Sequence, residues 1–145
     1  MNKKNNKKNH NSSYEPSEKE KFMNPKQLKY FKQLLLTWKG DLLKESSNTL
    51  DHLKEESSNK PDNADRASIE SERSLELRTR DRERKLISKI NKALQKIEDG
   101  TYGYCEETNQ PISIARLKAR PIATLSIEAQ EMHEKFEKVY KEKEY

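Results

Sequence analysis

The sequence has very little of what disulfide-stapled, secreted or membrane-spanning proteins are built from. It contains one cysteine and three glycines in 145 residues, so an intramolecular disulfide is excluded and a reducing compartment is compatible with the chain. No apolar run approaches the roughly 20 residues of a membrane span. The lysines near the N-terminus are not followed by the apolar region of a secretory signal. We therefore expect a cytoplasmic protein without membrane contact.

Apolar residues are also scarce, at 30 % of the chain against 38 % for charged residues. A composition of this kind is typical either of disordered chains or of long helices that bury a narrow seam. The length suits a single domain. The sequence contains no phosphate-binding loop, dinucleotide fingerprint, nucleophile elbow or metal-binding histidine pair. The chain is therefore not expected to be an enzyme, and no catalytic residue is assigned.

The charges, which sum to +5, are unevenly placed along the chain. Residues 41–72 carry nine acids against four bases, whereas residues 78–96 carry eight bases against two acids. This separation indicates that one part docks onto a charged surface while another presents carboxylates. A protein that coats nucleic acid would show a more uniform basic face, so we expect no sequence-specific DNA binding.

Heptad spacing of apolar residues predicts two long helices joined by a short turn. Asn24 and Pro25 form a helix start, as N-cap and first helical residue. Pro61 interrupts the pattern, and Asp99 followed by Gly100 forms a helix stop. The predicted seams are Leu28, Phe31, Leu35, Trp38 and Leu42 in the first helix, and Leu86, Ile90, Ala93 and Ile97 in the second.

The predicted fold class is therefore all-α, with a long antiparallel coiled-coil hairpin over residues 22–99 whose tip lies at residues 59–67. Residues 1–21 are rich in asparagine, lysine and serine and are expected to form a disordered basic tail. From the tip to Gly100 the second helix would extend about 50 Å, at about 1.5 Å per residue. An arm of that length suits reaching into a partner better than building a core.

Residues 100–145 are expected to form a small globular head completed by a C-terminal helix. Residues 102–105 and 109–111 have the composition of turns, and residues 111–114 are assigned a short strand. Ser126 is the predicted N-cap of the last helix. The apolar face of that helix is expected to pack on the base of the hairpin, and it consists of Leu125, Ala129, Met132, Phe136 and Val139.

The head has the turn, strand and helix order of a module that normally holds zinc. A structural zinc site needs four thiolate or imidazole ligands, usually from two C-x-x-C pairs. The corresponding positions here are Cys105, Thr108, Ser126 and Ala129, a degenerate set, and neither His133 nor His52 completes it. We therefore expect no zinc cofactor, and we interpret Cys105 as a buried structural thiol rather than a nucleophile.

Two charged groups along the hairpin have more than one interpretation. Asp62 and Asp65 suit the N-cap and capping-box positions of the second helix, and they also suit a tip that projects carboxylates into a partner. The arginines of residues 78–84 alternate, so that Arg78 and Arg82 share one side of the helix and Arg80 and Arg84 the other. Such residues serve either a solvated, salt-bridged surface or docking to a protein.

Three separate segments resemble the DksA family of the DksA/TraR superfamily, bacterial transcription factors that bind RNA polymerase. They agree in charge, spacing and turn residues in one register, in a cysteine-poor variant that lacks the zinc ligands. The segments are DNADRA (62–67), SLELRTRDRERKLI (74–87), and EDGTYGYC (98–105) together with ARP (119–121).

The resemblance implies a regulator that inserts its coiled coil into the secondary channel of RNA polymerase. It implies repression of stable-RNA promoters and activation of some biosynthetic promoters, amplified in the stringent response by guanosine tetraphosphate (ppGpp). The chain would act as a monomer. The implied site residues are Asp62, Asp65 and Ala67 at the tip, Arg78, Arg82 and Leu86 for polymerase docking, and Lys89 and Arg120 for ppGpp, which is bound together with polymerase.

A third position of the family's ppGpp site, a lysine, is Gln130 in this chain. Loss of that charge would weaken phosphate binding, which relies on cationic contacts. Two rival functions remain open. One is a transcript-cleavage factor of the Gre type, which also carries acids at a coiled-coil tip, although the 102–129 module argues against it. The other is a coiled-coil scaffold or nucleic-acid-binding adaptor, which the lysine content favours.

Overall fold

The structure, a computed structural model, describes residues 14–58 and 63–143. Its four helices are α1 (Pro25–Ser58), α2 (Asn63–Asp99), α3 (Ile114–Ala119) and α4 (Ile127–Lys143). Among these residues, β-type pairing is limited to one isolated antiparallel bridge, between Tyr104 and Pro111. The all-α class predicted from the heptad pattern is confirmed.

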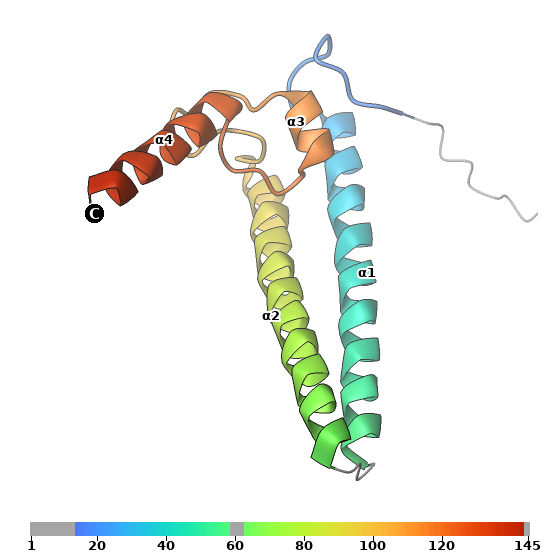
Figure 1. Ribbon diagram of the computed structural model, residues 1–145. Helices are drawn as coiled ribbons and strands as arrows, with labels where there is room; N and C mark the ends of the chain where they lie inside the picture. Colours follow the sequence, from blue (N-terminus) through green and yellow to red (C-terminus); the bar gives the residue numbers. More distant parts are fainter. Residues whose placement is uncertain (1–13, 59–62, 144–145) are drawn as a thin grey trace, which may run out of the picture.

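Helices α1 and α2 run antiparallel as a long hairpin, and the small head lies at the end that holds the start of α1 and the end of α2 (Figure 1). The 37 residues of α2 give it a length of about 55 Å. No helix in the described part of the chain has the length and hydropathy that crossing a bilayer requires.

The predicted helix ends are formed by specific backbone and side-chain hydrogen bonds. The Asn24 side chain accepts a hydrogen bond of 3.0 Å from the Gln27 N–H, as an N-cap does. Gly100 ends α2 with a φ of 77°, a conformation that glycine adopts without steric cost. The Thr101 N–H then bonds the Lys96 carbonyl at 2.9 Å. The predicted N-cap of α2, Asp62, lies outside the described residues.

The apolar core sits where the hairpin joins the head. Phe31 and Leu35 of α1 and Ile90 of α2 are fully buried, and the Phe31 ring lies 5.6 Å from that of Tyr102. The Tyr102 hydroxyl donates a buried hydrogen bond of 2.8 Å to the Pro121 carbonyl. Burial of Tyr102 also raises the pKa of its phenol, so the group stays a neutral donor.

Toward the tip the seam becomes exposed and polar. Leu75 and Leu77 of α2 are 65 % and 53 % exposed. Midway along the arm, the Ser46 hydroxyl of α1 donates a hydrogen bond of 2.8 Å to the buried carboxylate of Glu83 on α2. Among the side chains that the structure describes, the fully buried apolar residues therefore lie toward the base of the arm, and Leu75 and Leu77 add little apolar burial.

Residues 14–24 pack against the head and the start of α1, although residues 1–21 were expected to form a disordered tail. Pro16 is buried, and the Phe22 ring meets Tyr104 edge-on at 5.2 Å. Met23 covers Gly103, where an added Cβ would lie 2.9 Å from the Met23 side chain. Residues 1–13 of the predicted tail lie outside the described residues.

Gln27 is the polar centre of this N-terminal segment and is fully buried. Its side-chain oxygen accepts a hydrogen bond of 2.8 Å from the Met23 N–H, and its amide nitrogen donates one of 3.1 Å to the Ser17 carbonyl. The first of these contacts resembles a capping box, in which a side chain at the third helical position reaches back to the backbone. Gln27 therefore holds residues 14–24 on the start of α1.

Replacing Gln27 by alanine is expected to lower the free energy of unfolding by about 1–3 kcal/mol. The substitution leaves the part-buried Met23 N–H without a partner and removes one of the two donors to the Ser17 carbonyl, the other being the Glu20 N–H. Urea denaturation of the full chain measures this change. The matched control is Gln33→Ala, an exposed glutamine of the same helix, which should change the value by less than about 0.5 kcal/mol. Equal effects of the two substitutions would show that Gln27 does not hold the segment.

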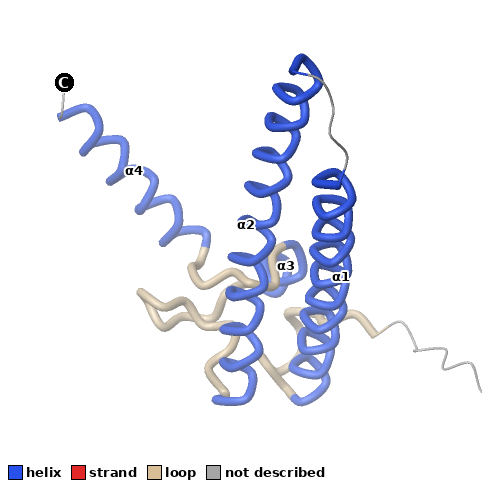
Figure 2. Tube along the Cα trace, turned by 90° about the horizontal axis from the view of Figure 1, so that it is seen from below, coloured by secondary structure: helices blue, strands red, loops and turns tan. Residues whose placement is uncertain are grey.

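The head differs from two expectations. The short strand assigned to residues 111–114 is wrong beyond the single bridge at Pro111, because Ser113 caps α3 by accepting a hydrogen bond of 3.3 Å from the Arg116 N–H. The expected packing of α4 on the hairpin is also wrong. Figures 1 and 2 show α4 running away from the hairpin, and Phe136 and Val139 are 59 % and 47 % exposed.

The physical reason is that the head core is already filled. Ile112 and two residues of α3 itself, Ile114 and Leu117, are almost fully buried. Helix α4 adds only Ala129 to this core. The start of α4 was predicted correctly, since Ser126 accepts a hydrogen bond of 3.3 Å from the Ala129 N–H. Position within the helix decides which apolar residues are covered.

Candidate functional site

The tip of the hairpin lies at the end farthest from the core. Ala67 is exposed on the second turn of α2. Asp65 belongs to the first turn of the same helix, but its side chain lies outside what the structure describes, as does the whole of Asp62. The predicted roles of the two carboxylates therefore stay predictions.

Two of the three residues predicted to dock on polymerase are exposed to solvent on the basic side of α2. Arg78 and Arg82 are exposed and lie one helical turn apart on one side. Leu86 is half-buried and packs against the apolar core. It therefore lies at the boundary between the buried seam of the hairpin and the exposed arginines. On the opposite side, Arg84 forms an exposed ion pair of 3.2 Å with Asp81. Such a pair adds little stability.

The two residues predicted to bind ppGpp line the same pocket, together with Gln130. The pocket has a volume of about 290 Å³ and lies between the last turns of α2, the loop after α2, the end of α3 and the start of α4. Lys89 comes from α2, Arg120 from the C-cap of α3 and Gln130 from α4. Lys89 is thus brought together with Arg120 and Gln130, which follow it by 31 and 41 positions in the sequence.

The pocket is strongly basic, since five cationic side chains line it against a single carboxylate, that of Glu106. Two of the cations are engaged: Lys96 pairs with Glu106 at 2.5 Å, and the Arg116 Nε donates to the Leu125 carbonyl at 2.9 Å. The side chains of Lys89, Lys92 and Arg120 make no ion pair or hydrogen bond with other described residues. The arrangement favours an anionic ligand.

Sequence reasoning missed the three other cations of this pocket, Lys92, Lys96 and Arg116. A signal for two of them was available. Lys89, Lys92 and Lys96 are spaced three and four residues apart on a helix, which places them on one face. Nothing in the local sequence around Arg116 indicates that α3 carries it to the same place.

The four positions equivalent to zinc ligands also come together in the head. Cys105 is buried, and its pKa is set by two opposing effects. Burial raises the pKa of the thiol, but the Thr108 side chain and the backbone N–H groups of Ser126, Thr108 and Glu107 bond the sulfur and lower its pKa to about 6. The loop thus keeps the N–H donors that surround a thiolate.

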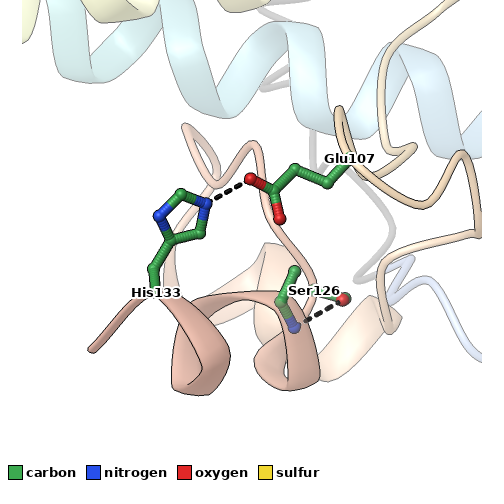
Figure 3. A network of polar contacts seen from close by, with 4 residues as sticks. Glu107, Ser126 and His133 are labelled. Carbon is green, nitrogen blue, oxygen red and sulfur yellow. Dashed lines mark hydrogen bonds and ion pairs between the residues drawn. The ribbon is translucent and has the colours of Figure 1, made fainter. Parts of the chain in front are cut away.

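Polar contacts join this loop to α4 (Figure 3). The His133 ring contacts the Glu107 carboxylate, and Ser126 caps the helix through the Ala129 N–H. Both His133 and Glu107 are about half exposed. The contact between His133 and Glu107 links α4 to this loop.

Two family models match the chain, one for each part of the fold. Residues 27–97 match the model described as "DnaK suppressor protein DksA, N-terminal domain", which corresponds to the α1–α2 hairpin. Residues 100–135 match the model described as "Prokaryotic dksA/traR C4-type zinc finger", which corresponds to the head and the start of α4. Together they span most of the described residues.

The zinc-finger match corrects one prediction. We expected zinc to be no cofactor of this module, and that expectation is contradicted, because residues 100–135 match the model of a C4-type zinc finger. The ligand set is nevertheless altered. Cys105 is the single cysteine of the chain, and within residues 14–58 and 63–143 no three His, Cys, Asp or Glu side chains gather as a metal set. The described residues do not supply four zinc ligands, so no step of the function is derived through zinc.

Relatives that match most of the chain carry the same family name. The chain is 62% identical over 131 residues to the RNA polymerase-binding transcription factor DksA of Caulobacter vibrioides, covering 90% of this chain and 92% of the relative. It is 48% identical over 125 residues to the protein of that name from Salmonella typhimurium, covering 86% and 83%. The solved structure of transcription factor DksA2 from Pseudomonas aeruginosa matches with a TM-score of 0.76 and 40% identity over 81% of this chain and 90% of that one. The chain belongs to the DksA family.

Proposed function

We propose that this protein is a transcription regulator that binds RNA polymerase and places its hairpin in the secondary channel. The observation that supports the proposal most directly is the relation just described, in which relatives named for RNA polymerase binding match about nine-tenths of the chain. In this proposal the protein performs no covalent chemistry of its own. It acts as a monomer in the bacterial cytoplasm, where it alters promoter complexes, and it does not read DNA sequence.

The shape of the hairpin supports insertion into a channel. Helix α2 is about 55 Å long, and in its outer half Leu75 and Leu77 are mostly exposed. The head is much wider than the arm in Figure 1, so it would stop the arm at a channel entrance. Asp62, Asp65 and Ala67 would then lie nearest the polymerase active site.

The docking contacts in this proposal come from the basic side of α2. Arg78 and Arg82 are exposed and would pair with acidic groups at the channel entrance, while Leu86 fixes where that surface meets the core. Arginine suits this role, since its planar fork binds carboxylates in two places. The outer part of the hairpin is acidic and the middle of α2 is basic, so the protein's charge is unevenly distributed along the arm. Such a distribution would orient the protein as it approaches polymerase and speed correct docking.

Regulation by ppGpp is proposed for the basic pocket. Lys89 and Arg120 line it from two elements and have no charged partner among the described residues. With polymerase closing the open side, these cations would bind the phosphates of the nucleotide. The proposed outcome is stronger repression of stable-RNA promoters and activation of some biosynthetic promoters during the stringent response.

Replacing Arg82 by alanine is expected to weaken binding to core RNA polymerase about tenfold or more, the typical effect of removing a charged anchor from an interface. Titration of labelled polymerase with the purified protein measures the dissociation constant. Arg84→Ala is the matched control, because Arg84 lies on the other side of α2 and pairs with Asp81. Absence of any polymerase binding by the unaltered protein, or of any inhibition of a ribosomal RNA promoter, would refute the proposed function.

A further inference from the structure

We propose that Lys92 is a phosphate-binding residue of the basic pocket and supplies the positive charge that Gln130 does not provide. The ligand class is a nucleotide carrying several phosphates. This inference rests on the proposed function, since ppGpp bound with polymerase is the occupant that we propose for the pocket.

The position of Lys92 on α2 is the first argument. Lys89 and Lys92 lie three residues apart on one face of the helix, which separates their Cα atoms by about 4.5 Å along the axis. Both line the same pocket of about 290 Å³, and Arg120 lines it from the C-cap of α3. Two ammonium groups on one wall and a guanidinium on another suit a group of adjacent phosphates.

The second argument is which cations are available. Lys96 is half-buried and is neutralised by Glu106 at 2.5 Å. The Arg116 side chain is tied to the Leu125 carbonyl at 2.9 Å. Lys92, in contrast, is exposed and makes no ion pair or hydrogen bond within the described part of the chain. Of the three cations beyond Lys89 and Arg120, Lys92 is therefore the one that can meet an anion without breaking an existing contact.

The third argument concerns Gln130. Its side-chain nitrogen donates a hydrogen bond of 3.3 Å to the Glu134 carboxylate one turn along α4, so its donor is directed along its own helix. An amide is also uncharged, and hydrogen bonds from a charged donor to phosphate are about twice as strong as neutral ones. Gln130 lines the pocket but leaves a deficit of one positive charge, which Lys92 can fill.

The test is direct binding of ppGpp to the complex of the full chain with RNA polymerase, at saturating chain. Lys92→Gln is expected to raise the dissociation constant of ppGpp about tenfold, the loss typical of one charge-assisted contact. Thermal stability and polymerase affinity should not change. Lys29→Gln, an exposed lysine of α1 outside the pocket, is the matched control and should bind ppGpp like the unaltered protein.

A second substitution tests the compensation itself. Gln130→Lys in the Lys92→Gln background is expected to restore ppGpp affinity to within about threefold of the unaltered complex, because it returns one positive charge to the same pocket. The inference is overturned if Lys92→Gln leaves ppGpp affinity unchanged while Lys89→Gln weakens it. It is also overturned if Lys92→Gln weakens polymerase binding instead. If neither Lys89→Gln nor Arg120→Gln affects ppGpp, the proposed occupant of the pocket is wrong as well.

Discussion

Replacing Phe31 by alanine is expected to lower the free energy of unfolding by about 3–5 kcal/mol, the usual cost of removing a buried aromatic ring. Phe31 is fully buried and contacts rings on two sides, with Tyr102 at 5.6 Å and Tyr30 at 5.2 Å. It joins α1 to the head, where most of the apolar burial of this chain is found. Small domains are stable by about 5–15 kcal/mol in total, so the loss is a large share.

Urea denaturation followed by the fluorescence of Trp38, the single tryptophan, measures this loss at the hairpin base. Leu36→Ala is the matched control, because Leu36 lies in the same helix and is 47 % exposed. It should cost less than about 1 kcal/mol. A loss below that value for Phe31→Ala would mean that stability resides elsewhere, for example along the outer arm.

The hairpin could be predicted from sequence because its signals are local and periodic. Seam residues recur at spacings of three and four, and the buried members, such as Leu35 and Ile90, are those that the heptads indicate. The ends of the helices have equally local causes, namely Asn24 at the start of α1 and Gly100 after α2. Nothing beyond neighbouring residues was needed.

The helix α4 shows where periodicity stops being informative. Its apolar residues share one face, which predicts a helix correctly but does not say what covers that face. In the structure Ala129 is buried, whereas Met132 and Phe136 are 58 % and 59 % exposed. The difference follows from distance along α4, since only its first turn reaches the head core. That information lies in the three-dimensional arrangement.

The packing of the N-terminal segment and the composition of the basic pocket could not be predicted from local sequence either, because both depend on contacts between distant segments. Composition indicated disorder up to Lys21, yet Pro16 is buried, and the Tyr14 ring lies 6.4 Å from the Tyr30 ring of α1. The pocket residues Lys89 and Arg120 came from family resemblance, and the charge balance around them became visible only when α2, α3 and α4 were placed together. Lys92 belongs to the site because of that convergence.

Replacing Asp65 by asparagine is expected to reduce inhibition of a ribosomal RNA promoter about 10- to 100-fold, while binding to RNA polymerase is retained. The substitution preserves shape and removes the charge, and a charged hydrogen bond in a partner's site is worth about 1.5–3 kcal/mol. Asp65 lies in the first turn of α2, where a carboxylate also favours the helix by about 0.3–1 kcal/mol. The loss of regulation should therefore greatly exceed the loss of stability.

The comparison that decides the mechanism is between Asp65→Asn and Glu72→Gln, measured in the same transcription assay. Glu72 is an exposed acid farther along α2, about 10 Å from Asp65 along the helix axis, and its neutralisation should leave inhibition within about twofold of the unaltered protein. If both substitutions reduced inhibition equally, the acidic arm would act through its general field. If neither did, the tip carboxylate would have no part in regulation. A selective loss with Asp65→Asn at unchanged polymerase affinity is the result that the tip mechanism requires, because docking then depends on Arg78 and Arg82, midway along α2, and regulation on the tip.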